Sequence, residues 1–191
     1  MLLNFYIFSL AILLALLEIQ IEGREGWAKN LPAWRPHSGS LAARWYRKFM
    51  SGKELTGYHA VLLAFIFLVF LFPYAWGVRL DLFNFFKTVS LFFFFAVLWD
   101  FLWFVLNPHY SLKKFHRRHI SWHLKWIGRA PADYYYGIGL SFAAAFLGSF
   151  VVGTDLLSWW IWHAAAFGLE VIITVLFTLY ILKIDTWIRD N

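Results

Sequence analysis

The sequence contains no cysteine, so the chain cannot form a disulfide, a thiolate metal site or a cysteine nucleophile. It also lacks three enzyme motifs: the His-Glu-x-x-His zinc motif, the Walker phosphate-binding motif and the Gly-x-Ser-x-Gly nucleophile motif. Charge is scarce as well. Charged residues make up 15% of the 191 residues, whereas soluble domains carry about a quarter. These absences exclude disulfide-stabilised secreted domains and the enzyme classes that those motifs define.

Aromatic and aliphatic residues are abundant instead. Hydrophobic residues make up 61% of the chain, and its 22 Phe and 12 Trp are more than one small soluble core could bury. A chain this rich in aromatics is not disordered. Lys and Arg outnumber Asp and Glu by 17 to 11. Because the chain is so apolar, we expect membrane lipids, and no nucleic acid, as partners of this positive charge. The composition predicts an integral membrane protein.

Five apolar stretches are long enough to cross a membrane, since about 20 residues at about 1.5 Å each span the hydrocarbon core. The predicted spans are 2–19, 59–78, 82–106, 134–152 and 156–184. They predict an all-α fold: a polytopic transmembrane helical bundle in a single domain over 1–191, with long loops at 22–57 and 107–133. The first stretch lacks the basic start and small-residue cleavage site of a signal peptide, so we expect it to be retained.

The basic residues are concentrated in the two long loops. They are Arg24, Lys29, Arg35, Arg44, Arg47, Lys48 and Lys53 in the first loop, and Lys113, Lys114, Arg117, Arg118, Lys125 and Arg129 in the second. Loops rich in Lys and Arg stay on the cytoplasmic side of a membrane. We therefore expect both loops and the C-terminus in the cytoplasm, the N-terminus outside, and a location in the cell's inner or plasma membrane.

Each long loop contains a segment with the pattern of an amphipathic helix lying in the headgroup layer on the cytoplasmic side. Ser40 is the predicted N-cap of a short helix that ends near Met50. Ser111 is the predicted N-cap of a second helix that ends near Gly128, because glycine favours termination. On this second helix, the apolar residues fall on one half and the Lys and Arg residues on the other.

Three histidines share the apolar half of the second predicted helix. At about 3.6 residues per turn, His116, His119 and His123 project within about 60° of one another. A helix that only contacted solvent or lipid phosphates would place its imidazoles on the basic face. The pattern indicates that the three rings turn toward the bundle.

Acidic residues occur inside the predicted spans, where a carboxylate costs about 2.5 kcal/mol or more unless it has a partner. Glu18 and Glu22 lie one helical turn apart at the end of the first span, and Asp100 lies in the third. His59 opens the second span. The predicted topology places these residues at the same membrane depth as the three histidines. Glu170, near the middle of the fifth span, joins them if that span is tilted.

Imidazoles and carboxylates at one depth are the donors that Zn²⁺ and Fe prefer. We predict metal ligation by His116, His119, His123, Asp100 and Glu18, with Asp100, Glu18 and Glu170 as candidate catalytic acids or bases. The expected function is a small metal-dependent membrane enzyme that acts on a lipid or another hydrophobic substrate. Two iron ions would favour oxidation of the substrate, and one Zn²⁺ would favour hydrolysis.

Other interpretations of the same residues stay open. The acids could form ion pairs without metal, for example Glu22 with Arg24 or Asp100 with Arg117, and the histidines could contact lipid headgroups. Intramembrane acids also mark proton or cation carriers and channels, which with five spans would require a homo-oligomer. His59 and a loop histidine could ligate haem. A purely structural role is the remaining alternative.

Aromatic residues cluster at the ends of the predicted spans. Tyr134, Tyr135 and Tyr136 begin the fourth span, as expected for rings that anchor a helix at headgroup depth. We predict no chemistry for them.

Overall fold

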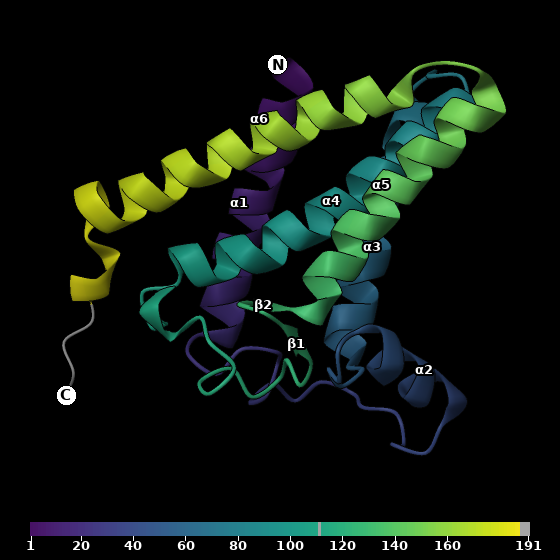
Figure 1. The fold of residues 1–191 in the computed structure, drawn as a ribbon. Coiled ribbons are helices and arrows are strands. Elements are labelled where there is room, and N and C mark those ends of the chain that lie inside the picture. The colour runs from purple at the N-terminus through teal and green to yellow at the C-terminus, as the bar shows by residue number, and fades with distance from the viewer. Residues whose placement is uncertain (111, 188–191) are drawn as a thin grey trace.

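The computed structural model describes residues 1–110 and 112–187. Ser111, the predicted cap of the second loop helix, lies outside the described residues. Within them the chain forms six α-helices: α1 (Leu2–Glu22), α2 (Leu41–Phe49), α3 (Gly57–Ala75), α4 (Leu82–Leu106), α5 (Ala132–Val152) and α6 (Leu156–Leu176) (Figure 1). The shorter elements are the turns η1 (Leu112–Lys114) and η3 (Ile184–Thr186), the π-helical segment η2 (Phe177–Leu182) and the strands β1 (Trp126–Ile127) and β2 (Ala130–Pro131).

Five helices in the described part of the chain are long and apolar enough to cross a membrane. They are α1, α3, α4, α5 and the continuous segment Leu156–Leu182 formed by α6 and η2. Their bounds agree with the predicted spans to within a few residues, because an unbroken apolar run of this length is compatible only with a helix in lipid. The prediction of an all-α, membrane-spanning bundle is confirmed.

The helix α4 lies at the centre of the bundle, between α1 and α5 (Figure 1). Its large side chains Phe95, Leu98 and Leu102 are almost completely buried and form much of the core. The helix α5 approaches α4 closely where Gly137 faces Val97, since a Cβ atom at Gly137 would lie 2.4 Å from Val97 Cγ2. Small residues permit such close packing in membranes, where the hydrophobic effect between helices is weak.

The first loop forms the predicted amphipathic helix. This helix, α2, begins after Ser40, whose hydroxyl accepts a hydrogen bond from the Ala43 amide at 3.2 Å. The side chains of Trp45 and Phe49 are exposed and stack on each other, with ring centroids 5.6 Å apart. Aromatic rings of this kind suit the headgroup layer of a membrane.

The predicted helix over 111–128 is wrong. The described residues of this loop form the turn η1, further turns and an antiparallel hairpin, in which Trp126 pairs with Pro131 and Ile127 with Ala130. The physical reason is packing: Phe115 lies against Phe104 at the end of α4, with ring centroids 4.9 Å apart. Contacts of this kind outweigh the modest intrinsic helix preference of a short segment.

The two long loops lie at the same end of the bundle, which we call the loop end (Figure 1). The Leu124 amide in the second loop donates to the Ser51 carbonyl in the first, at 2.9 Å. The Asn107 side chain donates to the Gly23 carbonyl, also at 2.9 Å. The predicted topology requires this placement, because an even number of spans separates the two loops.

Candidate functional site

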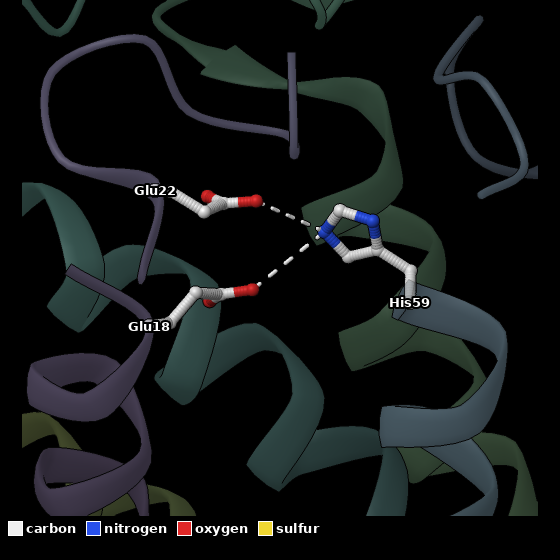
Figure 2. A group of neighbouring side chains, drawn as sticks. All are labelled: Glu18, Glu22 and His59. Atoms are coloured by element: carbon white, nitrogen blue, oxygen red, sulfur yellow. Dashed lines mark ion pairs between the residues drawn. The ribbon is translucent and has the colours of Figure 1, made fainter. Parts of the chain in front are cut away.

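Two glutamates and one histidine meet at the loop end of α1 and α3, as Figure 2 shows. The Nε2 atom of His59 lies 3.6 Å from Glu18 Oε1 and 3.5 Å from Glu22 Oε1. One donor atom from each of the three residues lies within 4.8 Å of the other two. Their side chains are at most 8% exposed. We call these three residues the Glu–His triad.

Local structure orients each member of the triad. Glu18 and Glu22 project from the same face of α1 one turn apart. His59 lies in the first turn of α3, whose N-cap Thr56 accepts a hydrogen bond from the His59 amide at 3.2 Å. The Thr56 hydroxyl also lies 2.8 Å from His59 Nδ1. When Nδ1 donates its hydrogen to Thr56, Nε2 keeps a free lone pair that faces the two carboxylates.

The segment that follows α1 closes over the triad. The Trp27 indole stacks on the His59 ring with a centroid separation of 3.9 Å, and the Ala28 amide donates to Glu22 Oε1. Trp27 and Ala28 adopt left-handed backbone conformations, with φ values of 49° and 51°. Such conformations cost non-glycine residues about 1–2 kcal/mol each, and they are concentrated at functional sites. The strain is the consequence of bringing one ring and one amide onto the triad.

A second polar cluster adjoins the triad, and we call it the lysine network: Lys53, Asp100, His123, Asp133 and Tyr134. Lys53 Nζ lies 2.9 Å from Asp100 Oδ1 and 3.0 Å from Asp133 Oδ2. The Tyr134 hydroxyl donates to Asp100 Oδ2 at 2.6 Å. The two ring nitrogens of His123 face the same acids, at 3.2 Å from Asp133 Oδ1 and 3.4 Å from Asp100 Oδ2. The network thus links both loops to α4 and α5.

Lys53 is held in its charged form at this position. Its side chain is only 2% exposed, and burial by itself lowers the pKa of an ammonium group. The nearby carboxylates of Asp100 and Asp133 outweigh that effect and raise the pKa of Lys53 above its ordinary value. The ammonium also lies 4.2 Å from the centre of the Trp27 ring, so this indole separates Lys53 from His59.

Tyr46 of α2 lies near the charged groups of the lysine network. Burial raises the pKa of its phenol to about 12, so the hydroxyl is neutral at physiological pH. The hydroxyl oxygen is buried and has no hydrogen-bond partner among the described residues.

Both clusters line one cavity of about 880 Å³. Its buried or half-buried charged and imidazole groups are Glu18, Glu22, Lys53, His59, Asp100 and Asp133. Its apolar wall is formed by α3, α4 and α5, with Leu63, Phe92, Phe93, Ala96, Val97 and Leu140. A mostly apolar cavity with a few convergent polar groups is typical of a ligand site.

The structure brings together only part of the predicted site. Glu18 and Asp100 line the cavity, and His123 is buried beside Asp100. His116 and His119 are exposed, because the helix that would have turned them inward does not form. The residues that join Glu18 are instead Glu22 and His59.

Glu170 lies apart from the cavity lining among the described residues. The helix α6 crosses α1 near the N-terminal end of α1 (Figure 1), where Asn4 donates to the His163 carbonyl at 3.3 Å. Glu18 is fourteen positions from Asn4, or about 21 Å along α1 at about 1.5 Å per residue. The tilt of the last span therefore does not bring Glu170 to the loop end.

Sequence reasoning missed several residues of the site. Lys53 was one of many loop lysines, and nothing in its neighbourhood along the chain distinguishes it. Tyr134 was predicted to be a membrane anchor without chemistry, but its hydroxyl binds Asp100. Asp133 precedes Tyr134 directly, and an acid at the start of an apolar span was the available signal. Neither proposed arginine pair is observed in the described residues: Glu22 faces His59, and Asp100 faces Lys53.

Comparison of the chain with protein-family models, curated proteins and solved structures gives no match. The fold and the site therefore define its class by themselves. The chain is a polytopic helical membrane protein with a buried Glu–His triad in a largely apolar cavity.

Proposed function

We propose that the Glu–His triad binds one divalent metal ion, and that the protein is a membrane metalloenzyme whose hydrophobic substrate occupies the adjoining cavity. The observation that carries this proposal is the spacing of the donor atoms. Distances of 3.5 and 3.6 Å from His59 Nε2 to the two carboxylates exceed the usual 2.7–3.2 Å or so of an N–H···O bond. Ligands held at about 2.0–2.1 Å around a tetrahedral ion lie about 3.3 Å apart, which is close to the observed spacing.

Burial supports the same conclusion. Two carboxylates and an imidazole nitrogen lie together with little exposure, and His59 Nε2 has no hydrogen-bond partner among the described residues. Placing two acids this close is costly unless a cation neutralises them. A divalent ion would neutralise both carboxylates and use the free lone pair of His59.

Zn²⁺ or Fe²⁺ suits a site of one imidazole and two carboxylates. Glu18, Glu22 and His59 would hold the ion, and a bound Zn²⁺ would activate water for hydrolysis near neutral pH. The described residues contain one group of this kind, so we propose a single ion. A single ion favours hydrolysis of an ester or amide over the oxidation that two irons would perform.

The lysine network has a supporting role in this proposal. Asp100 already faces the Lys53 ammonium, the Tyr134 hydroxyl and a His123 nitrogen, which leaves it little capacity to accept another proton. We infer that Asp100 positions Lys53 and Tyr134 along the cavity wall and does not act as the base. The two glutamates of the triad remain the residues closest to the proposed ion.

Metal analysis of the purified protein tests the proposal. Wild-type protein purified without metal-affinity steps and incubated with Zn²⁺ should retain about one equivalent per chain, as a three-ligand site implies. His59→Ala should lose this metal. His119→Ala is the matched control, because it removes an exposed imidazole outside the triad, and it should retain the metal. If both variants retained the same amount of metal, or if the wild type bound none, the triad would be an ion-pair cluster without metal.

Turnover provides the second readout. Long-chain p-nitrophenyl esters in detergent micelles should be hydrolysed by the Zn²⁺-loaded protein and not after chelation, with recovery when Zn²⁺ is restored. Metal binding without hydrolysis, together with Zn²⁺-dependent ion flux in liposomes, would favour a carrier over an enzyme.

A further inference from the structure

The cavity is long as well as apolar. Along α4 its wall runs from Asp100 to Phe92, which is about 12 Å at about 1.5 Å per residue. The polar groups of both clusters lie at the loop end of this wall, and the lining residues of α4 that lie deeper in the bundle, Phe92, Phe93, Ala96 and Val97, are all apolar. A volume of about 880 Å³ falls within the range of about 300–1,000 Å³ that is typical of small-molecule sites.

One side of the cavity is open at membrane depth. Leu140 lines the cavity and is 49% exposed, although it lies inside the spanning helix α5. Its neighbour Gly139 also lines the cavity, and a Cβ atom there would meet nothing within 4 Å. Exposed positions of a spanning helix face lipid. The gap between the lining residues of α3 and α5 is therefore accessible from the hydrocarbon phase.

Positively charged side chains lie where the lining of the cavity reaches the loop end, which we call the mouth of the cavity. Lys48 and Lys125 line the cavity and are exposed, unlike the buried Lys53. Lys125 also lines a second hollow of about 670 Å³, together with Arg117 and Arg118. The interior is different, because its four carboxylates would outnumber the three positive charges of Lys53 and the proposed divalent ion. An anionic group is thus favoured at the mouth and disfavoured inside.

From these observations we infer that the substrate is a phosphate-bearing membrane lipid. One hydrocarbon chain lies in the cavity along α4, having entered between α3 and α5, and the phosphate lies at the mouth beside Lys125, Arg117 and Arg118. The inference rests on the proposed function for the identity of the reacting group. That group is the carboxylic ester that joins the acyl chain to the glycerol, at the level of the triad. Its hydrolysis would consume one water, break the bond between the acyl carbon and the glycerol oxygen, and release a fatty acid and a lysophospholipid.

Photo-crosslinking tests the position of the chain. The probe is phosphatidic acid with a diazirine in one acyl chain, and the protein is reconstituted in phosphatidylcholine liposomes. In the wild type the probe should label peptides that contain Phe92 to Val97 and Gly137 to Leu140. Gly139→Leu places a side chain in the open space at this side of the cavity and should lower labelling about ten-fold, which corresponds to about 1.4 kcal/mol. Gly168→Leu is the matched control, because Gly168 also faces open space but lies on α6, away from the cavity; it should label as the wild type does.

A comparison of two probes tests whether the phosphate binds at the mouth of the cavity. Diacylglycerol with the same diazirine chain should label less than phosphatidic acid at low salt. Lys125→Gln should reduce this difference without changing the labelling by diacylglycerol, and high salt should also reduce it because exposed charges are screened. The inference would be overturned if Gly139→Leu and the wild type were labelled equally, or if the labelled peptides lay on other surfaces. A preference for diacylglycerol over phosphatidic acid would also overturn it.

Metal content measured on the same samples separates the two proposals. Labelling of the cavity by a protein that binds no metal would refute the proposed function and leave the lipid site standing. A metal-loaded wild type that is not labelled in the cavity would refute the lipid site alone.

Discussion

Lys53 joins the first loop to two of the spanning helices. Its ammonium faces Asp100 on α4 and Asp133 on α5, and it lies over the Trp27 ring from the segment after α1. Because the side chain is almost completely buried, water cannot replace it as a partner for the two acids. Removing one partner from a buried ion pair leaves the other charge uncompensated, which costs more than the pair contributes.

Lys53→Met should therefore destabilise the protein by about 3–5 kcal/mol, the usual cost of an unpaired buried charge. Thermal unfolding followed by tryptophan fluorescence measures the change. Lys29→Met is the control, because Lys29 forms an exposed pair with Glu25 and its loss should leave the midpoint nearly unchanged. Adding Asp133→Asn to Lys53→Met should restore part of the stability. An unfolding midpoint for Lys53→Met as high as that of Lys29→Met would contradict this assignment.

Individual residues differ in how far the sequence reveals them. Glu18 and Asp100 are recognisable because a carboxylate inside an apolar run has an evident solvation cost. His59 lies just inside such a run, so its depth was predictable, but its partners on α1 were not. Lys53 lies in a polar loop, where a lysine is ordinary, and only the fold shows that it is buried.

Single helices were predictable from the sequence where only one backbone structure is stable. The five spans follow from the need to satisfy every backbone group inside lipid. The loop over 112–131 has no such constraint, and its apolar residues gain more by packing on α4 than by forming a helix. The cap of α2, Ser40, was predicted from the sequence, whereas the structure shows Thr56 as the cap of α3, with an additional contact to His59 of the triad.

The two N-caps, Thr56 and Ser40, can be compared by substitution. Thr56→Ala and Ser40→Ala each remove the N-cap of one helix, and each should cost about 0.5–2 kcal/mol of stability. Thr56→Ala should also weaken Zn²⁺ binding about 10–100-fold, because the hydroxyl orients the His59 ring. Chelator competition measures the affinity. Equal Zn²⁺ affinity in the two variants would show that Thr56 acts only as a cap.

The whole molecule presents both basic loops at one end, and the hydrogen bonds between the loops hold them together. This arrangement agrees with five spans. The distribution of Lys and Arg favours the cytoplasmic side, with the N-terminus outside.

The absence of cysteine makes this topology directly testable. Single cysteines introduced as Ser38→Cys and Ser121→Cys, at exposed positions of the two loops, should behave alike. In intact cells both should resist a membrane-impermeant maleimide, whereas Thr154→Cys, between α5 and α6, should react. Permeabilised cells provide the control in which all three react. Labelling of the loop cysteines in intact cells would reverse the orientation.

The sequence by itself determined that this protein lies in a membrane, how many spans it has and how deep its acidic residues lie along them. These properties depend on the hydropathy of contiguous residues. Only the tertiary structure decided which side chains meet. The triad joins residues 18 and 22 to residue 59, and the lysine network joins residue 53 to residues 100 and 133. Hydropathy fixes the position of a residue along the membrane normal, but its lateral neighbours depend on how whole helices pack, which no local pattern encodes.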